Sequence, residues 1–201
     1  TVLCERYTFA PKIQIDIVDG IFAAPASWPY EPNGTPSDAR MVCERFEIQV
    51  DIMAIDPLAM AEAWVAAGAR ELVIHLETAA DLDPFKALRQ AKQVKLWLAG
   101  ADTVPVDTYL THAADIDGVQ LMGISTIGQQ GQPPSPRVFD NIAGLRALAP
   151  NIPIQVDGSV SERTITVWRK AGATDFVVGS AIAQSPDPRG SYAALAAAVC
   201  Q

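Results

Sequence analysis

The chain has little cysteine: Cys4, Cys43 and Cys200 are the three cysteines in 201 residues, and no two form a C-x-x-C pair. A scattered, odd set is typical of reduced thiols and not of a disulfide framework, so we expect a cytoplasmic protein. No apolar run approaches the roughly 18 residues that a membrane-spanning helix needs, and no signal-peptide pattern is visible. The first residue is Thr1, so we expect further residues before it.

Basic residues are also few, with 15 Lys and Arg against 23 Asp and Glu and a net charge of −8. Without Lys/Arg runs, an acidic chain is poorly suited to nucleic acid or to an anionic membrane, so we expect neither partner. A phosphate group would instead be held locally by backbone N–H groups. The length and the 49% hydrophobic content predict one sizeable core and a single domain over residues 1–201.

Apolar runs alternate with amphipathic or Ala-rich segments along the chain, as in repeated βα units. This order predicts a parallel sheet, either open and doubly wound or closed into a (β/α)8 barrel. Seven strands are counted, and Thr1–Phe9 reads as the end of a first helix, so the first barrel strand is expected before Thr1. The predicted strands are Lys12–Val18, Glu47–Met53, Glu71–Leu76, Val94–Leu98, Gly118–Gly123, Ile152–Asp157 and Asp175–Val178. The predicted helices are Pro57–Ala67, Phe85–Ala91, Asp140–Ala149, Ser161–Ala171 and Tyr192–Val199.

Two aspartates, Asp16 and Asp157, each follow a short apolar run near the end of a predicted strand. In a parallel barrel the strand ends and the loops after them build the active site. Two carboxylates facing one sugar could remove a proton on one side and return one on the other. That chemistry is epimerisation beside a carbonyl group.

Glycine-rich segments follow three successive predicted strands, and glycines let backbone N–H groups approach an anion closely. Barrels commonly bind phosphate with the loops after their last strands and a nearby helix N-terminus. The sequence therefore predicts a phosphate site at Gly128, Gly131, Gly158, Ser159, Gly179 and Ser180.

The chain resembles the ribulose-phosphate 3-epimerase family over nearly its whole length. The resemblance implies a TIM (β/α)8 barrel that acts on a phosphorylated ketose, with D-ribulose 5-phosphate and D-xylulose 5-phosphate as the leading pair, and homo-oligomers are expected. The matching stretches are Ile15–Phe22, Val50–Met53, Ala67–Ala69, Ile74–Glu77, Gly128–Gln132, Val156–Gly158, Ala171–Ala173 and Val178–Ile182.

The resemblance also implies catalytic and metal-binding residues. Asp16 and Asp157 match the family's two acid/base residues, but the two histidine ligands are replaced by Gln14 and Asp51. Two outcomes stay open. Asp16, Asp51, Asp157 and the Gln14 amide oxygen could bind Mg²⁺ or Mn²⁺ in preference to Zn²⁺. Alternatively the metal is lost, and the activity is weakened or changed.

Three further positions match residues that lie near the substrate in the family: His75, Met53 and Met122. Two other functions remain alternatives. A related-barrel decarboxylase or aldolase would typically carry Asp-x-Lys-x-x-Asp, whereas Asp51–Asp56 contains no lysine. A non-catalytic or weakly active sugar-phosphate-binding homologue would keep the phosphate site without turnover.

Overall fold

The computed structural model describes residues 5–124 and 133–200, and it contains seven strands within those ranges. The chain divides into two compact units, residues 1–99 and residues 100–201.

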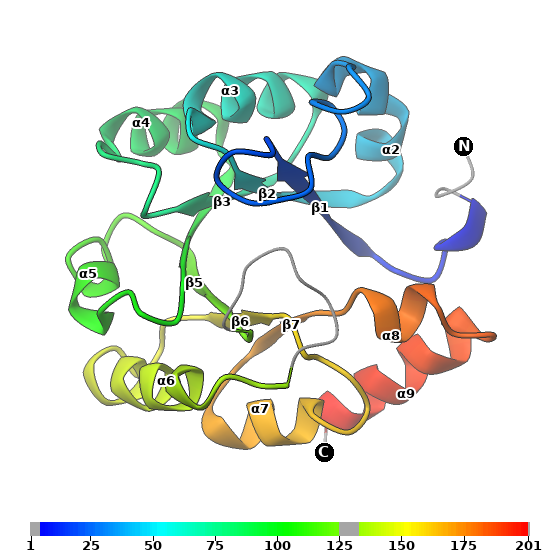
Figure 1. Cartoon of the computed structure of the whole chain (residues 1–201), viewed down its shortest axis with the longest axis vertical. Coiled ribbons are helices and arrows are strands. Elements are labelled where there is room, and N and C mark those ends of the chain that lie inside the picture. Colours follow the sequence, from blue (N-terminus) through cyan, green and yellow to red (C-terminus); the bar gives the residue numbers. More distant parts are fainter. Residues whose placement is uncertain (1–4, 125–132, 201) are drawn as a thin grey trace. The chain divides into compact units, whose positions relative to one another are not determined.

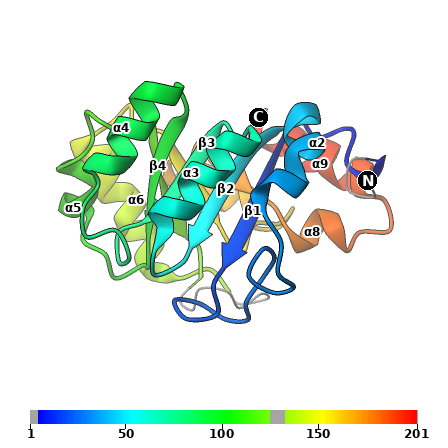
Figure 2. The ribbon, with the colours of Figure 1, turned by 90° about the horizontal axis from the view of Figure 1, so that it is seen from above.

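The first unit is a parallel sheet with helices packed on it. Strand β1 pairs with β2, β2 with β3, and β3 with β4, so neighbours along the chain are neighbours in the sheet. The helices of the unit lie against this sheet (Figures 1 and 2). The strands are β1 Lys12–Val18, β2 Glu47–Met53, β3 Glu71–His75 and β4 Lys95–Gly100. The helices are η1 Pro36–Ala39, α2 Arg40–Arg45, α3 Pro57–Ala67 and α4 Asp83–Lys92.

Strand β2 is covered on both faces, since every residue from Ile48 to Met53 is buried. A parallel strand that is covered on both faces should be apolar almost throughout, and β2 departs from this rule at Gln49 and Asp51. Helix α3 then begins at Pro57 and ends at Gly68, which adopts a left-handed φ of 115°. The two buried polar residues of β2 are therefore the positions that packing alone does not explain.

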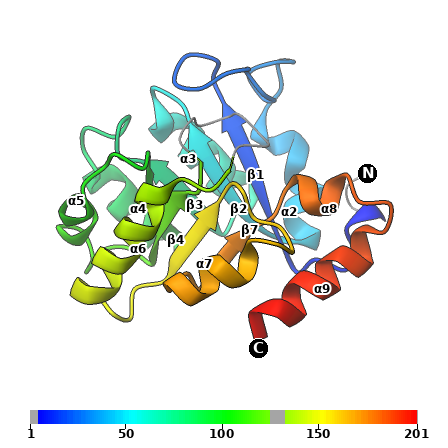
Figure 3. The same cartoon turned by 60° about the horizontal axis from the view of Figure 1, so that its bottom comes forward.

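The second unit has the same construction. Strands β5, β6 and β7 pair in parallel in chain order where their register is defined, and α6 and α7 lie along one side of β6 and β7 (Figure 3). The strands are β5 Gly118–Met122, β6 Ile154–Asp157 and β7 Asp175–Val177. The helices are α5 Val106–Leu110, α6 Pro136–Leu148, α7 Ile165–Ala171, α8 Ser180–Ala183 and α9 Pro188–Cys200.

The predicted strands agree with the observed ones to within two residues at each end. The predicted helix Ser161–Ala171 begins later, at Ile165, because the hydroxyl of Thr164 accepts a hydrogen bond from the Ser161 amide and holds that segment in a turn. Glu5 and Arg6 are helical, as expected for the end of a first helix. The strand expected before Thr1 and the single-domain organisation stay predictions.

Within residues 5–124 and 133–200, we find no helix with the length and apolar character needed to span a membrane. Cys43 and Cys200 are free thiols.

Candidate functional site

The carboxylates of Asp16 and Asp51 lie side by side in the first unit. The two residues are direct partners in the register of β1 and β2, and their carboxylate oxygens are within 4.8 Å of each other. Gln14 lies two residues before Asp16, so both side chains project from the same face of β1. The Gln14 amide nitrogen donates a hydrogen bond of 3.0 Å to Oδ1 of Asp16. Three of the predicted metal-site residues are thus neighbours.

The Asp16 carboxyl has a perturbed pKa. Desolvation and the charge of Asp51 raise the pKa of Asp16 to about 6, against smaller opposing effects of Gln14 and His75. Asp16 as a whole residue is exposed, so solvent screens part of this interaction. The proximity of a second carboxylate is nevertheless fixed by the strand register, and like charges at this separation oppose joint ionisation.

His75, the last residue of β3, is hydrogen-bonded to Asp51. Its Nε2 lies 2.9 Å from Oδ1 of Asp51, and both side chains have 0% exposure. Burial works to lower the pKa of His75, but the charge and hydrogen bond of Asp51 outweigh it, so the pKa is raised. The other ring nitrogen, Nδ1, is buried and has no hydrogen-bond partner among residues 5–124 and 133–200. Phe22 meets the imidazole ring edge-on, with the ring centroids 5.2 Å apart.

Asp19 joins the loops that follow β1 and β2. Its Oδ1 accepts hydrogen bonds from the amides of Ile21 and Phe22, and its Oδ2 accepts one of 2.8 Å from the amide of Ile55. Burial opposes ionisation, but these backbone donors prevail and lower the pKa of Asp19. Asp19 therefore fixes the segment that carries Phe22 to His75.

The predicted phosphate residues of the second unit lie at the ends of β6 and β7. Asp157 is the half-buried last residue of β6, and Gly158 and Ser159 follow with left-handed φ values of 99° and 54°. Gly179 precedes α8, and apart from Gly179 and its chain neighbours no atom of the described residues lies within 4 Å of the position that a Cβ would occupy there. Ser180 is the first residue of α8. Gly128 and Gly131 lie outside the described residues.

Two side chains hold the Ser159 backbone in place. The Ser159 carbonyl oxygen accepts a hydrogen bond of 2.5 Å from the Thr164 hydroxyl and a longer one of 3.4 Å from Trp168 Nε1. Left-handed φ is uncommon for serine, and such geometry persists where neighbouring groups determine it. Sequence reasoning missed Thr164 in this role, because a threonine near a helix start also fits an ordinary cap.

The two predicted methionines lie in the interior. Met53 is 4% exposed and Met122 is 3% exposed, each at the last position of its strand. Their burial fits ordinary packing, and their assignment to the substrate site stays a prediction.

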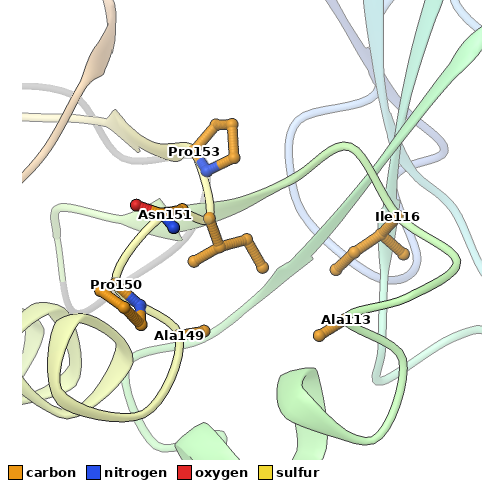
Figure 4. Close-up of a pocket in the computed structure, with 7 residues that line it drawn as sticks. Ala113, Ile116, Ala149, Pro150, Asn151 and Pro153 are labelled. Atoms are coloured by element: carbon orange, nitrogen blue, oxygen red, sulfur yellow. The ribbon is translucent and has the colours of Figure 1, made fainter.

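A separate hollow of about 390 Å³ opens beside the start of β6 (Figure 4). None of the described residues that line it has an ionisable side chain, so these residues offer no group for proton transfer. It also lies at the amino-terminal end of β6, away from Asp157. The lining residues are Ala113, Ile116, Ala149, Pro150, Asn151, Ile152 and Pro153.

The hydrogen bond between His75 and Asp51 was not foreseen from the sequence. Both residues were singled out, but separately, as a residue near the site and as a metal ligand. The signal was present in the spacing, because strand ends of consecutive βα units come together at one edge of a sheet. Only the register of β2 and β3 shows that the two side chains meet.

Comparison with known proteins gives a consistent picture. The model of the "Ribulose-phosphate 3 epimerase family" matches residues 12–183. The ribulose-phosphate 3-epimerase of Candida glabrata is 33% identical over 133 residues, which are 63% of this chain and 53% of that protein. The ribulose-phosphate 3-epimerase of Eremothecium gossypii is 27% identical over 138 residues, which are 69% of this chain and 57% of that protein. The chain thus spans little more than half the length of these two relatives.

The fold is also that of solved proteins. The 3-hexulose-6-phosphate synthase from Salmonella typhimurium matches with a TM-score of 0.73 at 15% identity, covering 100% of this chain and 92% of that chain. At this level of identity the likeness bears on the fold alone. It places the chain in the TIM (β/α)8 barrel class, which the family resemblance implied and which is one of the two folds that the alternation of strands and helices left open.

Proposed function

Because the chain belongs to the ribulose-phosphate 3-epimerase family, we propose that it is an isomerase that interconverts D-ribulose 5-phosphate and D-xylulose 5-phosphate. The observation that carries the proposal is Asp16 near the end of β1, with a raised pKa and a second carboxylate, Asp51, beside it. A carboxyl group with a pKa of about 6 exchanges protons readily near neutral pH. A related ketose phosphate is the alternative substrate.

In the proposed mechanism, Asp16 and Asp157 are the acid/base pair. One carboxylate removes the C3 proton, which the neighbouring C2 ketone acidifies, and an enediolate forms. The other carboxyl group delivers a proton to the opposite face of C3, so the configuration inverts. The assignment of Asp157 is supported by its position at the end of β6. It directly precedes Gly158 and Ser159, which both have left-handed φ values.

We assign a divalent cation, Mg²⁺ or Mn²⁺, to Asp16, Asp51, Asp157 and Gln14. The donors are suited to a hard cation, since all of them offer oxygen. Asp16 and Asp51 already converge within 4.8 Å, which leaves a concentration of negative charge for a cation to balance. The side-chain nitrogen of Gln14 donates a hydrogen bond to Asp16. The Gln14 oxygen could therefore bind the cation only after the amide group flips. The cation would stabilise the oxygens of the enediolate.

The phosphate group of the substrate is assigned to backbone N–H groups at Gly158, Ser159, Gly179 and Ser180, with Gly128 and Gly131 as the remaining predicted contacts. The support is the open space that the described residues leave beside Gly179, and the left-handed turn at Ser159 that the Thr164 hydroxyl holds. An acidic protein gains from this arrangement, because backbone donors bind an anion without a basic surface. Homo-oligomer formation and a cytoplasmic location stay predictions.

A sugar-phosphate-binding protein without turnover is the second candidate. The observation that favours it is the replacement of both histidine ligands expected from the resemblance, at Gln14 and Asp51. A decarboxylase or aldolase has less support, because no lysine lies between Asp51 and Asp56.

The test is a coupled assay of D-xylulose 5-phosphate formation, with wild type, Asp16→Asn and Asp157→Asn. Loss of one general acid/base should lower kcat by about 10²- to 10⁴-fold in each variant. Turnover in both variants at the wild-type rate would refute the assignment of these residues. Tight binding of D-ribulose 5-phosphate without any turnover by the wild type would establish the second candidate.

A further inference from the structure

We infer that His75 is a positioning residue for a cation site: its hydrogen bond holds the Asp51 carboxylate beside Asp16, so that the two can share one divalent ion. The inference rests on the proposed function and deepens it, because it names the residue that orients one of the carboxylate ligands of the proposed cation site.

The first support is burial. Asp51 and His75 both have fully buried side chains, and their Oδ1 and Nε2 atoms are 2.9 Å apart. A buried carboxylate keeps a defined orientation only while hydrogen-bond donors compensate its lost hydration. A ligand that must meet a cation in one geometry gains from such a fixed donor behind it.

The second support is the position of Asp16. Register brings Asp16 opposite Asp51, with their carboxylate oxygens within 4.8 Å. Two like charges so placed repel each other, and an unheld Asp51 side chain would turn away from Asp16 when both are ionised. The hydrogen bond from His75 opposes that rotation, and it does so from the far side of Asp51, on β3.

The third support is that the imidazole is itself held. His75 terminates β3, whose residues are all buried, and Phe22 packs edge-on against the ring at an interplanar angle of 62°. Phe22 belongs to the loop that Asp19 fixes through the amides of Ile21 and Phe22. The donor that faces Asp51 is therefore set by packing on the ring as well as by the strand.

Two substitutions of His75 differ in whether an amide nitrogen can reach Asp51. In His75→Gln, an amide nitrogen can occupy the place of Nε2, whereas the shorter amide of His75→Asn falls near the place of Nδ1 and does not reach Asp51. Gln49→Leu is the control. The Gln49 amide donates a hydrogen bond of 2.9 Å to the buried carboxylate of Glu71, on the same two strands but toward their other end. The control thus removes a buried donor from a different buried carboxylate, that of Glu71.

The experiment is Mn²⁺ titration of the full chain without substrate, followed by calorimetry and by loss of the free-ion EPR signal. We expect His75→Asn to weaken Mn²⁺ binding by about tenfold or more, as for other groups that orient metal ligands. His75→Gln should restore most of the affinity. Gln49→Leu should lower the melting temperature and leave Mn²⁺ binding unchanged.

Equal Mn²⁺ affinity in wild type and His75→Asn would overturn the inference, and so would equal weakening in Gln49→Leu. Absence of any Mn²⁺ binding by the wild type would overturn it as well. If His75→Asn does not fold, retention of wild-type affinity in His75→Gln supports the inference and its loss refutes it. Because no substrate is present, Mn²⁺ binding that follows this pattern stands even if the protein fails to epimerise D-ribulose 5-phosphate.

Discussion

His75 and Asp51 form a hydrogen-bonded pair that is closed to solvent, with Nε2 and Oδ1 2.9 Å apart and both side chains 0% exposed. The pair connects the ends of β2 and β3 to the carboxylate of Asp16, which lies opposite Asp51 on β1. The stability of the first unit and the chemistry proposed for Asp16 therefore share one group of residues.

Replacing Asp51 by Asn should destabilise the protein, because a buried imidazole then loses its charged partner. Breaking a buried pair costs about 3 kcal/mol in the free energy of unfolding. The pKa of His75 is raised in the folded state, so the pair's contribution is complete below the unfolded pKa and is lost as the pH rises through the folded pKa. Urea unfolding at several pH values checks this. Wild type should lose more stability than Asp51→Asn across that range, and parallel curves would contradict the assignment.

The raised pKa of Asp16 leads to a prediction for the protein without bound metal or substrate. A pKa of about 6 means that the folded state binds a proton more tightly than the unfolded state does, so this group favours folding less as the pH rises from about 4 to 6. In ¹³C-labelled protein, the Asp16 carboxyl resonance should titrate near pH 6, and it should titrate lower in Asp51→Asn because one repelling charge is gone. The Asp16→Asn spectrum identifies the resonance. Titration at the ordinary aspartate value in wild type would contradict the proposed coupling.

Glu71 holds a second buried charge at the other end of the same sheet. Its carboxylate is 0% exposed and accepts hydrogen bonds from Lys12 at 2.5 Å, Lys95 at 2.8 Å and Gln49 at 2.9 Å. Burial opposes ionisation, but the lysine hydrogen bonds prevail and lower the pKa of Glu71. Its stabilising effect is therefore present above the unfolded pKa and lost as the pH falls through the folded pKa.

The variant Glu71→Gln should lower the free energy of unfolding by about 2 kcal/mol, less than for a fully buried pair because Lys12 and Lys95 are partly exposed. Chemical denaturation at pH 7 measures this change. Lys86→Ala is the control, since Lys86 pairs with the exposed Asp83 and its loss should cost well under 1 kcal/mol. Equal losses in the free energy of unfolding in both variants would show that the buried Glu71 cluster stabilises the protein no more than an exposed ion pair does.

Thr164 should matter for phosphate binding. Thr164→Val keeps the shape of the side chain but removes the hydroxyl that donates to the Ser159 carbonyl. We expect the KM for D-ribulose 5-phosphate to rise by about fivefold to tenfold, since one hydrogen bond contributes about 1 kcal/mol. The value of kcat should change little.

Thr174→Val is the matched control for that experiment. The Thr174 hydroxyl accepts a hydrogen bond from the Ile154 amide at the opposite end of β6, away from Ser159. Its removal should reduce the melting temperature without altering KM. A similar KM in both variants and in the wild type would remove Thr164 from the phosphate site.

Much of the architecture was predictable from the sequence, because it depends on local signals. The apolar run of Lys12–Val18 predicted β1, and the Ala-rich segment Pro57–Ala67 predicted α3. The late start of α7 was not predictable in this way, since it depends on the turn that Thr164 makes with Ser161. Boundaries set by such side-chain hydrogen bonds compete with helix propensity and leave little pattern in the sequence.

The candidate site was predictable in its residue types and less so in its contacts. Asp16, Asp51 and His75 were each identified, but the hydrogen bond between His75 and Asp51 depends on strand register, which the sequence does not specify. Asp19 caps the turn after β1 by accepting the Ile21 and Phe22 amides, a local role that aspartate commonly has in turns. Its third bond, to the Ile55 amide after the next strand, is a tertiary contact that only the fold reveals.

Proton NMR of D-ribulose 5-phosphate in D₂O with the purified protein, in the presence of Mn²⁺ and again with EDTA, follows the fate of the C3 proton itself. We expect deuterium to enter C3 as D-xylulose 5-phosphate appears, and Mn²⁺ to accelerate the exchange. Retention of the C3 proton under both conditions, with no D-xylulose 5-phosphate formed, would contradict the proposed epimerisation.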